Sequence, residues 1–329
     1  MSVPILPGLQ LPWPTDWAVL FEREAPLLLE IGFGSGTFLV ELGQKRPSYN
    51  IIGLEISLPS LRRGAHKVSQ RGLTNVAIVQ ADANYALQAL LLPTSLHGVF
   101  INFPDPWPKP GHEQRRLLNE GFLHLLAGRM QDRATLDIAT DHPDYAQTIA
   151  ICLETTPYFE SRTGETAVIA AGRLGTKYEQ KGLAEGRPGH YFQFERNQTP
   201  PAHPFPVPKE LEMPHVVMES PLSLAQIAAQ FEPDSLTVGE TAVSLIELFQ
   251  SAREDKLLIE AYISEPPLSQ RIGAVIRRRR SGHLVVALHE IGFPRPTAGT
   301  HHLIRFLADW LLSLHSDTAV IRSTLGNGG

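Results

Sequence analysis

Short apolar segments alternate with helix-like stretches between residues 26 and 196, and this alternation constrains the fold more than any other feature of the chain. The apolar segments have the length of buried strands, and the stretches between them have the length of ordinary helices. Such alternation predicts a mainly parallel sheet with helices on both faces, an α/β domain. The strands are expected at Leu27–Ile31, Ile51–Leu54, Val76–Val79, Val99–Phe103 and Ala134–Ala139, and the helices at Leu58–Arg71, Gln114–Met130 and Tyr145–Leu153.

The regions on either side of this domain differ in composition. Residues 1–25 are rich in proline and predict an irregular arm, with Trp13 and Trp17 as its anchors. Residues 197–214 contain six prolines, which predicts a stiff, extended linker. Residues 215–329 predict a smaller α+β domain with hairpin-spaced strands. Its elements are expected as a helix at Leu222–Phe231, strands at Ala242–Phe249, Lys256–Ile263, Arg271–Arg278 and Leu284–Leu288, and a last helix at His301–Leu314.

Composition limits the class of protein. The 329 residues suffice for two domains, and 43% hydrophobic residues suffice for ordinary cores. No apolar run reaches membrane-spanning length and the N-terminal residues lack the pattern of a signal peptide, so no membrane partner and a cytoplasmic location are expected. The single cysteine, Cys152, excludes an internal disulfide and a thiolate cluster, and we interpret it as a core residue. The net charge of −5 does not indicate a nucleic-acid binder, although it leaves room for a local basic surface.

A glycine-rich loop follows the first strand of the α/β domain. Gly32, Gly34 and Gly36 are evenly spaced, so the third glycine of the dinucleotide fingerprint is replaced by Thr37. This departure favours a different ligand. Alternate glycines with Glu30 two residues upstream resemble the S-adenosylmethionine loop of Rossmann-like methyltransferases.

Two further acids follow the next strands. Glu55 ends the second strand, where an acidic residue can hold a ribose diol, and Asp82 follows the third, beside an expected adenine ring. The alternative for each acid is a helix N-cap or a surface position. Together with Glu30, these acids lie at the carboxyl ends of successive strands, the edge at which open α/β sheets bind ligands. The sequence therefore predicts one cofactor site at this edge.

The fourth strand ends in a segment bracketed by prolines, Phe103–Lys109. Pro104, Pro106 and Pro108 remove backbone donors and fix φ, so the strand cannot continue through them. Asp105 is then held stiffly at the rim of the expected site. The alternative is a turn aspartate that caps the next helix.

Four segments resemble the tRNA (guanine-N7-)-methyltransferase family: Leu29–Gly34, Phe103–Lys109, Ala139–Asp141 and Thr176–Glu179. Their order along the chain agrees with the family, and the resemblance covers residues 26–196. It implies a seven-stranded Rossmann-like sheet, S-adenosylmethionine as the cofactor, and tRNA as the partner, methylated at N7 of guanosine 46. Two other functions stay open: a methyltransferase that acts on a small molecule or protein, and a noncatalytic tRNA-binding module.

The resemblance also implies roles for individual residues. Asp105 would be the active-site residue. Cofactor contacts would come from Glu30, Gly32, Gly34, Glu55, Asp82 and Asp105, and substrate contacts from Lys109, Arg115, Arg116, Asp141, Thr176, Lys177, Tyr178 and Glu179. Guanine N7 carries a lone pair and no proton, so we expect Asp105 to align the base and complement its charge instead of acting as a base. His112, His142 and His190 are interpreted as structural or substrate-contacting, and because no metal-ligand spacing links them, no metal is expected.

The chain departs from the family in residues 110–116. The family carries a dense basic patch there, whereas this segment keeps only Arg115 and Arg116 as cations. Since phosphate contacts supply most nonspecific RNA affinity, another surface is expected to compensate. The candidate is Arg277–Arg280, and the alternative is a solvated turn that discourages edge pairing. The sequence does not indicate whether the chain forms oligomers.

Overall fold

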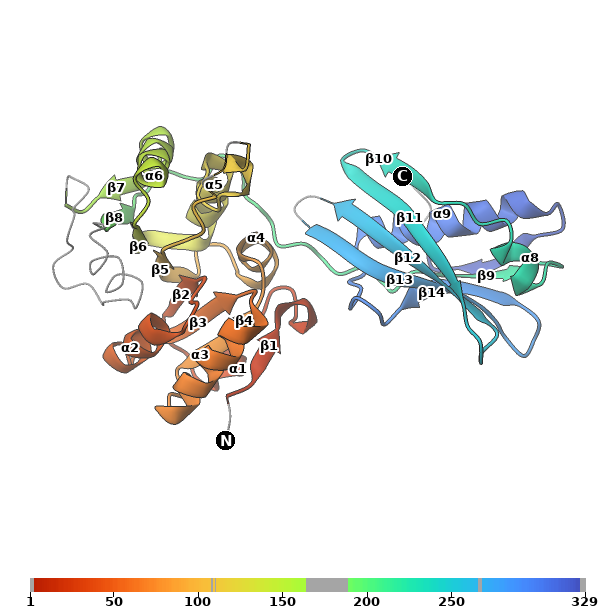
Figure 1. Ribbon diagram of the computed structural model, residues 1–329, viewed down its shortest axis with the longest axis horizontal. Coiled ribbons are helices and arrows are strands. Elements are labelled where there is room, and N and C mark those ends of the chain that lie inside the picture. Colours follow the sequence, from red (N-terminus) through yellow and green to blue (C-terminus); the bar gives the residue numbers. More distant parts are fainter. Residues whose placement is uncertain (1–2, 108, 110, 164–188, 266–267, 326–329) are drawn as a thin grey trace. The chain divides into compact units, whose positions relative to one another are not determined.

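The computed structural model describes residues 3–107, 109, 111–163, 189–265 and 268–325. The chain divides into two compact units, Met1–Pro208 and Lys209–Gly329 (Figure 1). Each unit has a hydrophobic core of its own. The boundary falls within the stretch 197–214 that we interpret as a linker. No helix in the described ranges is long and apolar enough to cross a membrane.

The first unit contains the predicted α/β sheet. Its strands follow the order β1-β4-β3-β2-β5-β6-β8-β7, with parallel pairing from β1 to β6 and antiparallel pairing of β8 with β6 and β7. All five expected strands are present. The bounds are β1 Ile5–Pro7, β2 Leu27–Ile31, β3 Asn50–Glu55, β4 Val76–Gln80, β5 Leu96–Asn102, β6 Met130–Thr140, β7 Phe159–Ser161 and β8 His190–Arg196.

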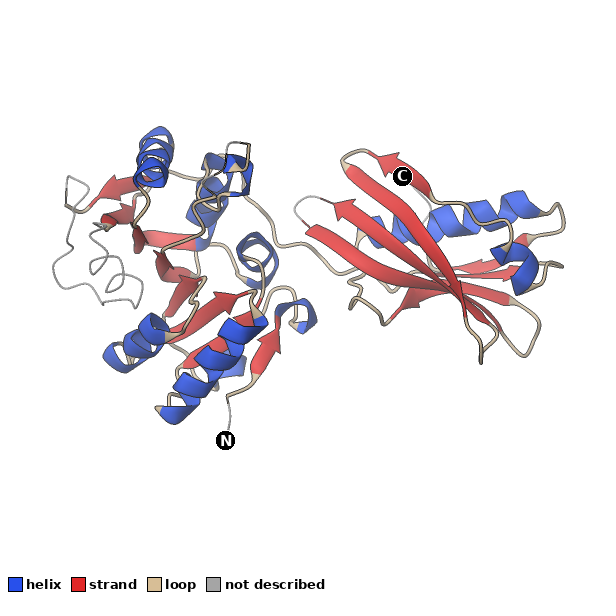
Figure 2. Cartoon of the chain, viewed as in Figure 1, coloured by secondary structure: helices blue, strands red, loops and turns tan. Residues whose placement is uncertain are grey.

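Helices cover both faces of this sheet (Figure 2). Neighbouring strand residues point to opposite faces: Leu28 packs with α2 and α3, whereas Leu29 packs with η2, α5 and α6. Burial on both faces explains why these strands are continuous apolar runs. The bounds are η1 Gly8–Gln10, α1 Trp17–Phe21, α2 Thr37–Lys45, α3 Leu58–Gln70, α4 Ala83–Tyr85, the π-helical η2 Ala86–Leu90, η3 Glu113–Arg115, α5 Glu120–Arg129 and α6 Pro143–Thr155.

The N-terminal arm is more regular than its composition suggests. It supplies β1, which pairs in parallel with β4 and adds an eighth strand to the seven expected. The two tryptophans anchor it as predicted. Trp13 Nε1 donates to the Tyr85 hydroxyl at 2.8 Å, and the buried Trp17 donates from Nε1 to Leu90 O at 3.2 Å.

The predicted linker is largely attached to the two units. Arg129 Nη2 donates to Phe205 O at 2.6 Å, which holds the first part of the stretch against the first unit. Leu211 N donates to Pro296 O at 2.8 Å, and Glu210 forms an ion pair with Arg295, so the last part belongs to the second unit. The segment between Phe205 and Glu210 is therefore much shorter than the predicted linker.

The second unit is an antiparallel sheet with strand order β10-β11-β12-β13-β14-β9-β15. Helix α9 packs on one face through buried residues such as Leu303, Leu307 and Leu311. This is the α+β architecture expected, with three strands (β9, β10 and β15) that we did not predict. The bounds are β9 His215–Glu219, α8 Leu224–Ala228, β10 Asp234–Val238, β11 Thr241–Gln250, β12 Lys256–Glu265, β13 Leu268–Arg278, β14 Leu284–His289, α9 Ala298–Leu314 and β15 Ala319–Ser323.

Candidate active site

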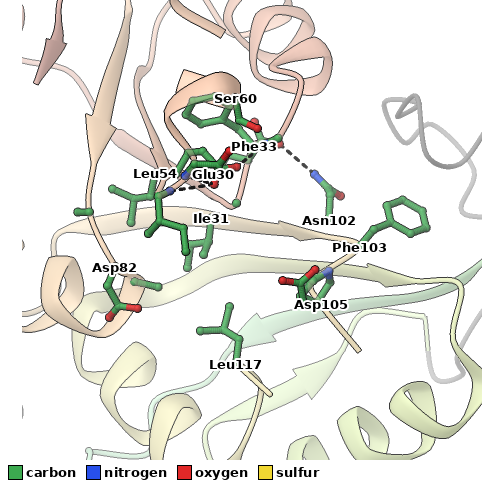
Figure 3. Close-up of a pocket in the computed structure, with 18 of the residues that line it drawn as sticks. Glu30, Ile31, Phe33, Leu54, Ser60, Asp82, Asn102, Phe103, Asp105 and Leu117 are labelled. Carbon is green, nitrogen blue, oxygen red and sulfur yellow. Dashed lines mark hydrogen bonds between the residues drawn. The ribbon is translucent and has the colours of Figure 1, made fainter. Parts of the chain in front are cut away.

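A cavity of about 670 Å³ opens at the carboxyl ends of β2 to β5 in the first unit (Figure 3). Its volume lies in the range typical of small-molecule and cofactor sites. The structure brings four acids from different strand ends to its wall: Glu30, Glu55, Asp82 and Asp105. Parallel strands deliver their carboxyl ends to one edge, which explains why residues far apart in the sequence meet here.

The glycine loop forms one wall of the cavity. Gly32 and Phe33 both donate from their backbone N–H groups to Leu54 O, at 2.9 and 3.3 Å, which ties the loop to β3. Gly32 has a φ of 70°, and apart from its neighbours in the chain no residue has an atom within 4 Å of the position that a Cβ would occupy. A ligand can therefore approach the backbone of Gly32 closely.

Glu30 lies at the base of the cavity and is only 1% exposed. Asn102 Nδ2 donates to Glu30 Oε1 at 3.4 Å, as the dashed line in Figure 3 shows. A carboxylate in so dry a position favours a cationic or hydrogen-bond-donating ligand group. We did not single out Asn102 from the sequence, although its place as the last residue of β5 follows the same strand-end rule.

Glu55 connects the glycine loop to the end of β3. Its Oε2 accepts from Gly34 N at 2.9 Å, and its Oε1 accepts from Ile56 N and Ser57 N at 2.8 and 3.0 Å. Two carboxylate oxygens offer about four acceptor positions, so capacity for a ligand hydroxyl remains. Ile56 is 68% exposed beside it and gives the cavity an apolar wall that the sequence did not reveal to us.

Asp82 has a structural task as well as a position on the cavity wall. Its Oδ1 accepts from Asn84 N and Tyr85 N at 2.9 and 3.2 Å, which caps α4. The helix-cap alternative is thus correct for Asp82, and it does not exclude ligand contact, because the same residue lines the cavity.

Asp105 is exposed at the rim of the cavity. The residues on either side, Phe103 and Trp107, adopt positive φ values of 52° and 42°, an unfavourable conformation for large side chains. Phe103 N donates to Ala139 O at 2.8 Å, which fixes the start of the loop against β6. The cap of the following helix α5 is Asn119, so Asp105 is not the capping residue of the alternative interpretation.

The two arginines downstream of Asp105 differ in their surroundings. Arg116 donates from Nε to Pro106 O at 2.9 Å and from Nη1 to Thr148 Oγ1 at 3.0 Å. Arg115 is exposed, lines the cavity, and places its guanidinium 5.1 Å from the centre of the Trp107 ring. The Arg116 contacts also explain why the predicted helix at Gln114–Met130 is wrong in its first part, since the chain folds back here and α5 begins only at Glu120.

Tyr145 supports this folded-back segment from α6. Its hydroxyl accepts from Leu118 N at 3.1 Å, and the Arg116 guanidinium lies 5.1 Å from its ring centre. The side chain is fully buried, and this burial raises the pKa of the phenol to about 12. Tyr145 and Arg116 therefore stabilise the segment between Pro106 and Leu118.

The structure describes only some of the other residues predicted to contact the substrate. Lys109 is exposed and does not line the cavity, and Asp141 directly follows β6. Thr176, Lys177, Tyr178 and Glu179 lie outside the described residues. His142 accepts from Tyr145 N through Nδ1 and caps α6, and this contact agrees with a structural role.

Comparison with known proteins assigns the family. Residues 24–191 match the model of a methyltransferase family described as "Putative methyltransferase". The chain is 32% identical over 304 residues to the tRNA (guanine-N(7)-)-methyltransferase of Thermus thermophilus, covering 91% of this chain and 93% of that one. It is 35% identical over 175 residues to the Thermotoga maritima enzyme of the same name, covering 53% and 55%. It is 39% identical over 171 residues to the Burkholderia vietnamiensis enzyme of the same name, covering 52% of this chain and 67% of that one. The chain therefore belongs to the tRNA (guanine-N(7)-)-methyltransferase family.

Proposed function

We propose that this protein transfers a methyl group from S-adenosylmethionine to N7 of guanosine 46 in the variable loop of tRNA. The observation that carries the proposal is the convergence of Glu30, Glu55, Asp82 and Asp105 on one cavity beside the glycine loop. Membership of the family supports the reaction, and the near-complete alignment with the Thermus enzyme supports the tRNA substrate. A tRNA substrate also fits the cytoplasmic location that we expect.

The residues of the cavity fit S-adenosylmethionine. The buried Glu30 carboxylate suits the ammonium of the methionine part, and the remaining acceptor capacity of Glu55 suits the ribose hydroxyls. Asp82 and Ile56 line the same cavity and suit the amino group and the face of the adenine. When bound, the cofactor supplies a methyl group on a positively charged sulfur.

Asp105 is proposed to orient the guanine. The base donates from its N1–H and its amino group, and Asp105 offers an exposed carboxylate at the cavity rim. Because N7 bears no proton, the side chain has none to remove. Its negative charge favours a base that becomes cationic on methylation, so it stabilises the transition state more than the ground state.

Different contacts are proposed for the flanking residues. Arg115 and Lys109 are exposed near the rim and can meet phosphates, and Asp141 and Thr176–Glu179 are proposed to complete the guanosine site. For Arg116, the bonds to Pro106 O and Thr148 Oγ1 favour support of the Asp105 loop over contact with tRNA.

The test is a methyl-transfer assay with labelled S-adenosylmethionine and an unmodified tRNA transcript, followed by nucleoside analysis. We expect label in 7-methylguanosine, and none with a matched transcript that carries adenosine at position 46. Label in another nucleoside would contradict the N7 assignment. Equal labelling of the two transcripts would contradict position 46 and leave the reaction type intact.

A further inference from the structure

The run Arg277–Arg280 lies at the end of the hairpin formed by β13 and β14. Both strands are interior to the second sheet, with β12 and β9 as their outer neighbours. The run does form a solvated turn, as the alternative interpretation has it, but an interior hairpin needs no charge to discourage edge pairing, so that part of the alternative does not apply. The four arginines require another explanation.

A second turn brings further charge to the same end of the sheet. Lys256 lies opposite Arg277 in the β12–β13 pairing, and Arg278 N donates to Asp255 O at 3.2 Å. The turn that contains Arg253 is therefore adjacent to the arginine run. We call Arg253, Lys256 and Arg277–Arg280 the basic end of the second unit.

Two of these six cations have partners within the fold. Arg278 donates to Leu222 O and Gly282 O, which holds the turn, and Lys256 forms an ion pair with Glu254. The other four, Arg253, Arg277, Arg279 and Arg280, are exposed, and their side chains form no hydrogen bond or ion pair with any described residue.

The basic end stands out because the rest of the unit is acidic. Its two turns carry six cations against two carboxylates, Glu254 and Asp255. The rest of residues 209–329 carries five cations against twelve carboxylates. Like charges held together repel one another, so a cluster of this kind favours a polyanionic partner. All four exposed cations are arginines, whose planar guanidinium groups bind phosphate with two parallel hydrogen bonds.

We propose that the basic end of the second unit binds the phosphate backbone of tRNA. This proposal rests on the proposed function, which supplies the polyanion. The described residues 109–116 offer only Lys109 and Arg115 as exposed cations, since Arg116 is bound within the fold. Phosphate contacts in the second unit supply affinity that the shortened basic run 110–116 does not.

The test is the double variant Arg279→Glu, Arg280→Glu in the full chain. Its matched control is Lys209→Glu, Arg322→Glu, which changes the net charge equally at exposed positions outside the basic end. We expect the test variant to bind tRNA roughly 10-fold more weakly and to reduce the slope of log affinity against log salt by about 2. The control is expected to match the parent protein, and all three are expected to bind S-adenosylmethionine alike.

Unchanged tRNA affinity and salt slope in the test variant would overturn the proposal, as would an equal loss in the control. These outcomes are separate from failure of the proposed function. Normal 7-methylguanosine formation with unchanged KM for tRNA would reject the basic end and retain the reaction. Absence of methylation by the parent would reject the reaction, whereas the binding measurements would still report on the basic end.

Discussion

The Asp105 carboxylate is held at the cavity rim by a strained backbone. Phe103 and Trp107 both have positive φ, and such conformations persist only where surrounding contacts fix them. Here the contacts come from Ala139 O, which accepts from Phe103 N, and from Arg116, which donates to Pro106 O. These contacts at both ends of the loop fix the direction of Asp105, which supports the role proposed for it.

Replacing Asp105 with asparagine keeps the shape of the side chain and removes its charge. We expect Asp105→Asn to lower the rate constant of methyl transfer roughly 100-fold, because the cationic product-like state loses a complementary charge. The measurement is single-turnover methylation with saturating cofactor. Asp132→Asn, an exposed aspartate in the first half of β6, is the control and should retain full activity. Near-normal turnover of Asp105→Asn would exclude the assigned role.

Arg116 and Arg115 are adjacent in the sequence, but we expect their substitution by lysine to change different kinetic parameters. A lysine at position 116 has one nitrogen in place of the separate Nε and Nη1 donors, so Arg116→Lys weakens the contacts that hold the Asp105 loop. We expect kcat to fall roughly 10-fold, with KM for tRNA little changed. Arg115→Lys should instead raise KM and leave kcat near the parent value. Steady-state kinetics of both variants decide this, and a rise in KM alone for Arg116→Lys would assign it to tRNA binding.

At the scale of elements, helix α6 supports the active-site loop through Tyr145. The folded protein holds the phenol proton up to a pKa of about 12, whereas an unfolded tyrosine releases it near pH 10. Between these pH values the folded state binds more protons than the unfolded state. The free energy of unfolding therefore falls as pH rises. Its full contribution is present below pH 10.

Tyr145→Phe therefore predicts a pH-dependent effect on stability. At pH 8 the variant loses the acceptor for Leu118 N, and we expect unfolding to require about 1 kcal/mol less than in the parent. The difference should narrow between pH 10 and 11, because only the parent loses stability through this phenol. Urea unfolding at pH 8, 9, 10 and 11 measures it. A difference that stays constant or widens with pH would contradict the buried, neutral phenol.

The elements predicted correctly are those whose burial produces a recognisable hydrophobic pattern in their own residues. Strands β2 to β6 are covered on both faces and therefore appear as apolar runs. Strand β15 has no buried face to produce a strand pattern, since all five of its residues are exposed, and β1 has only three residues, of which the last is Pro7. The start of α5 was misplaced because Arg116 binds the distant Thr148, a contact that no local pattern contains.

The site follows the same rule. Glu30, Glu55 and Asp82 were found because strand ends converge, a property of topology that the sequence pattern predicts. The split between Arg115 and Arg116 was not predictable, since it depends on where Tyr145 and Thr148 lie in α6. The roles of Thr176–Glu179 stay predictions.

At the scale of the whole molecule, the two units have separate cores and separate proposed tasks. All four cavity acids belong to the first unit, and the basic end belongs to the second. The Thermus relative aligns with both units, because 304 aligned residues exceed the length of the first unit. The two proposals together assign the chemistry to the first unit and part of the tRNA affinity to the second.

Truncation tests this division, and the contacts of the linker specify where to cut. A chain of residues 1–208 keeps Phe205 O for Arg129 and Thr199 O for Arg196, each bond 2.6 Å long. We expect it to bind S-adenosylmethionine as the full chain does and to bind tRNA roughly 10-fold more weakly. A chain of residues 1–196 loses both bonds to buried guanidinium groups, so its free energy of unfolding should fall by roughly 3 kcal/mol.

Calorimetric titration with the cofactor, tRNA binding and urea unfolding compare the two truncated chains with the parent. Equal tRNA affinity of residues 1–208 and the full chain would place all phosphate contacts in the first unit. Loss of cofactor binding by residues 1–208 would show that the cavity depends on the second unit, against the separation of the cores. Equal stability of the two truncated chains would contradict the attachment of residues 197–205 to the first unit, since Arg129 and Arg196 would then not need their partners there.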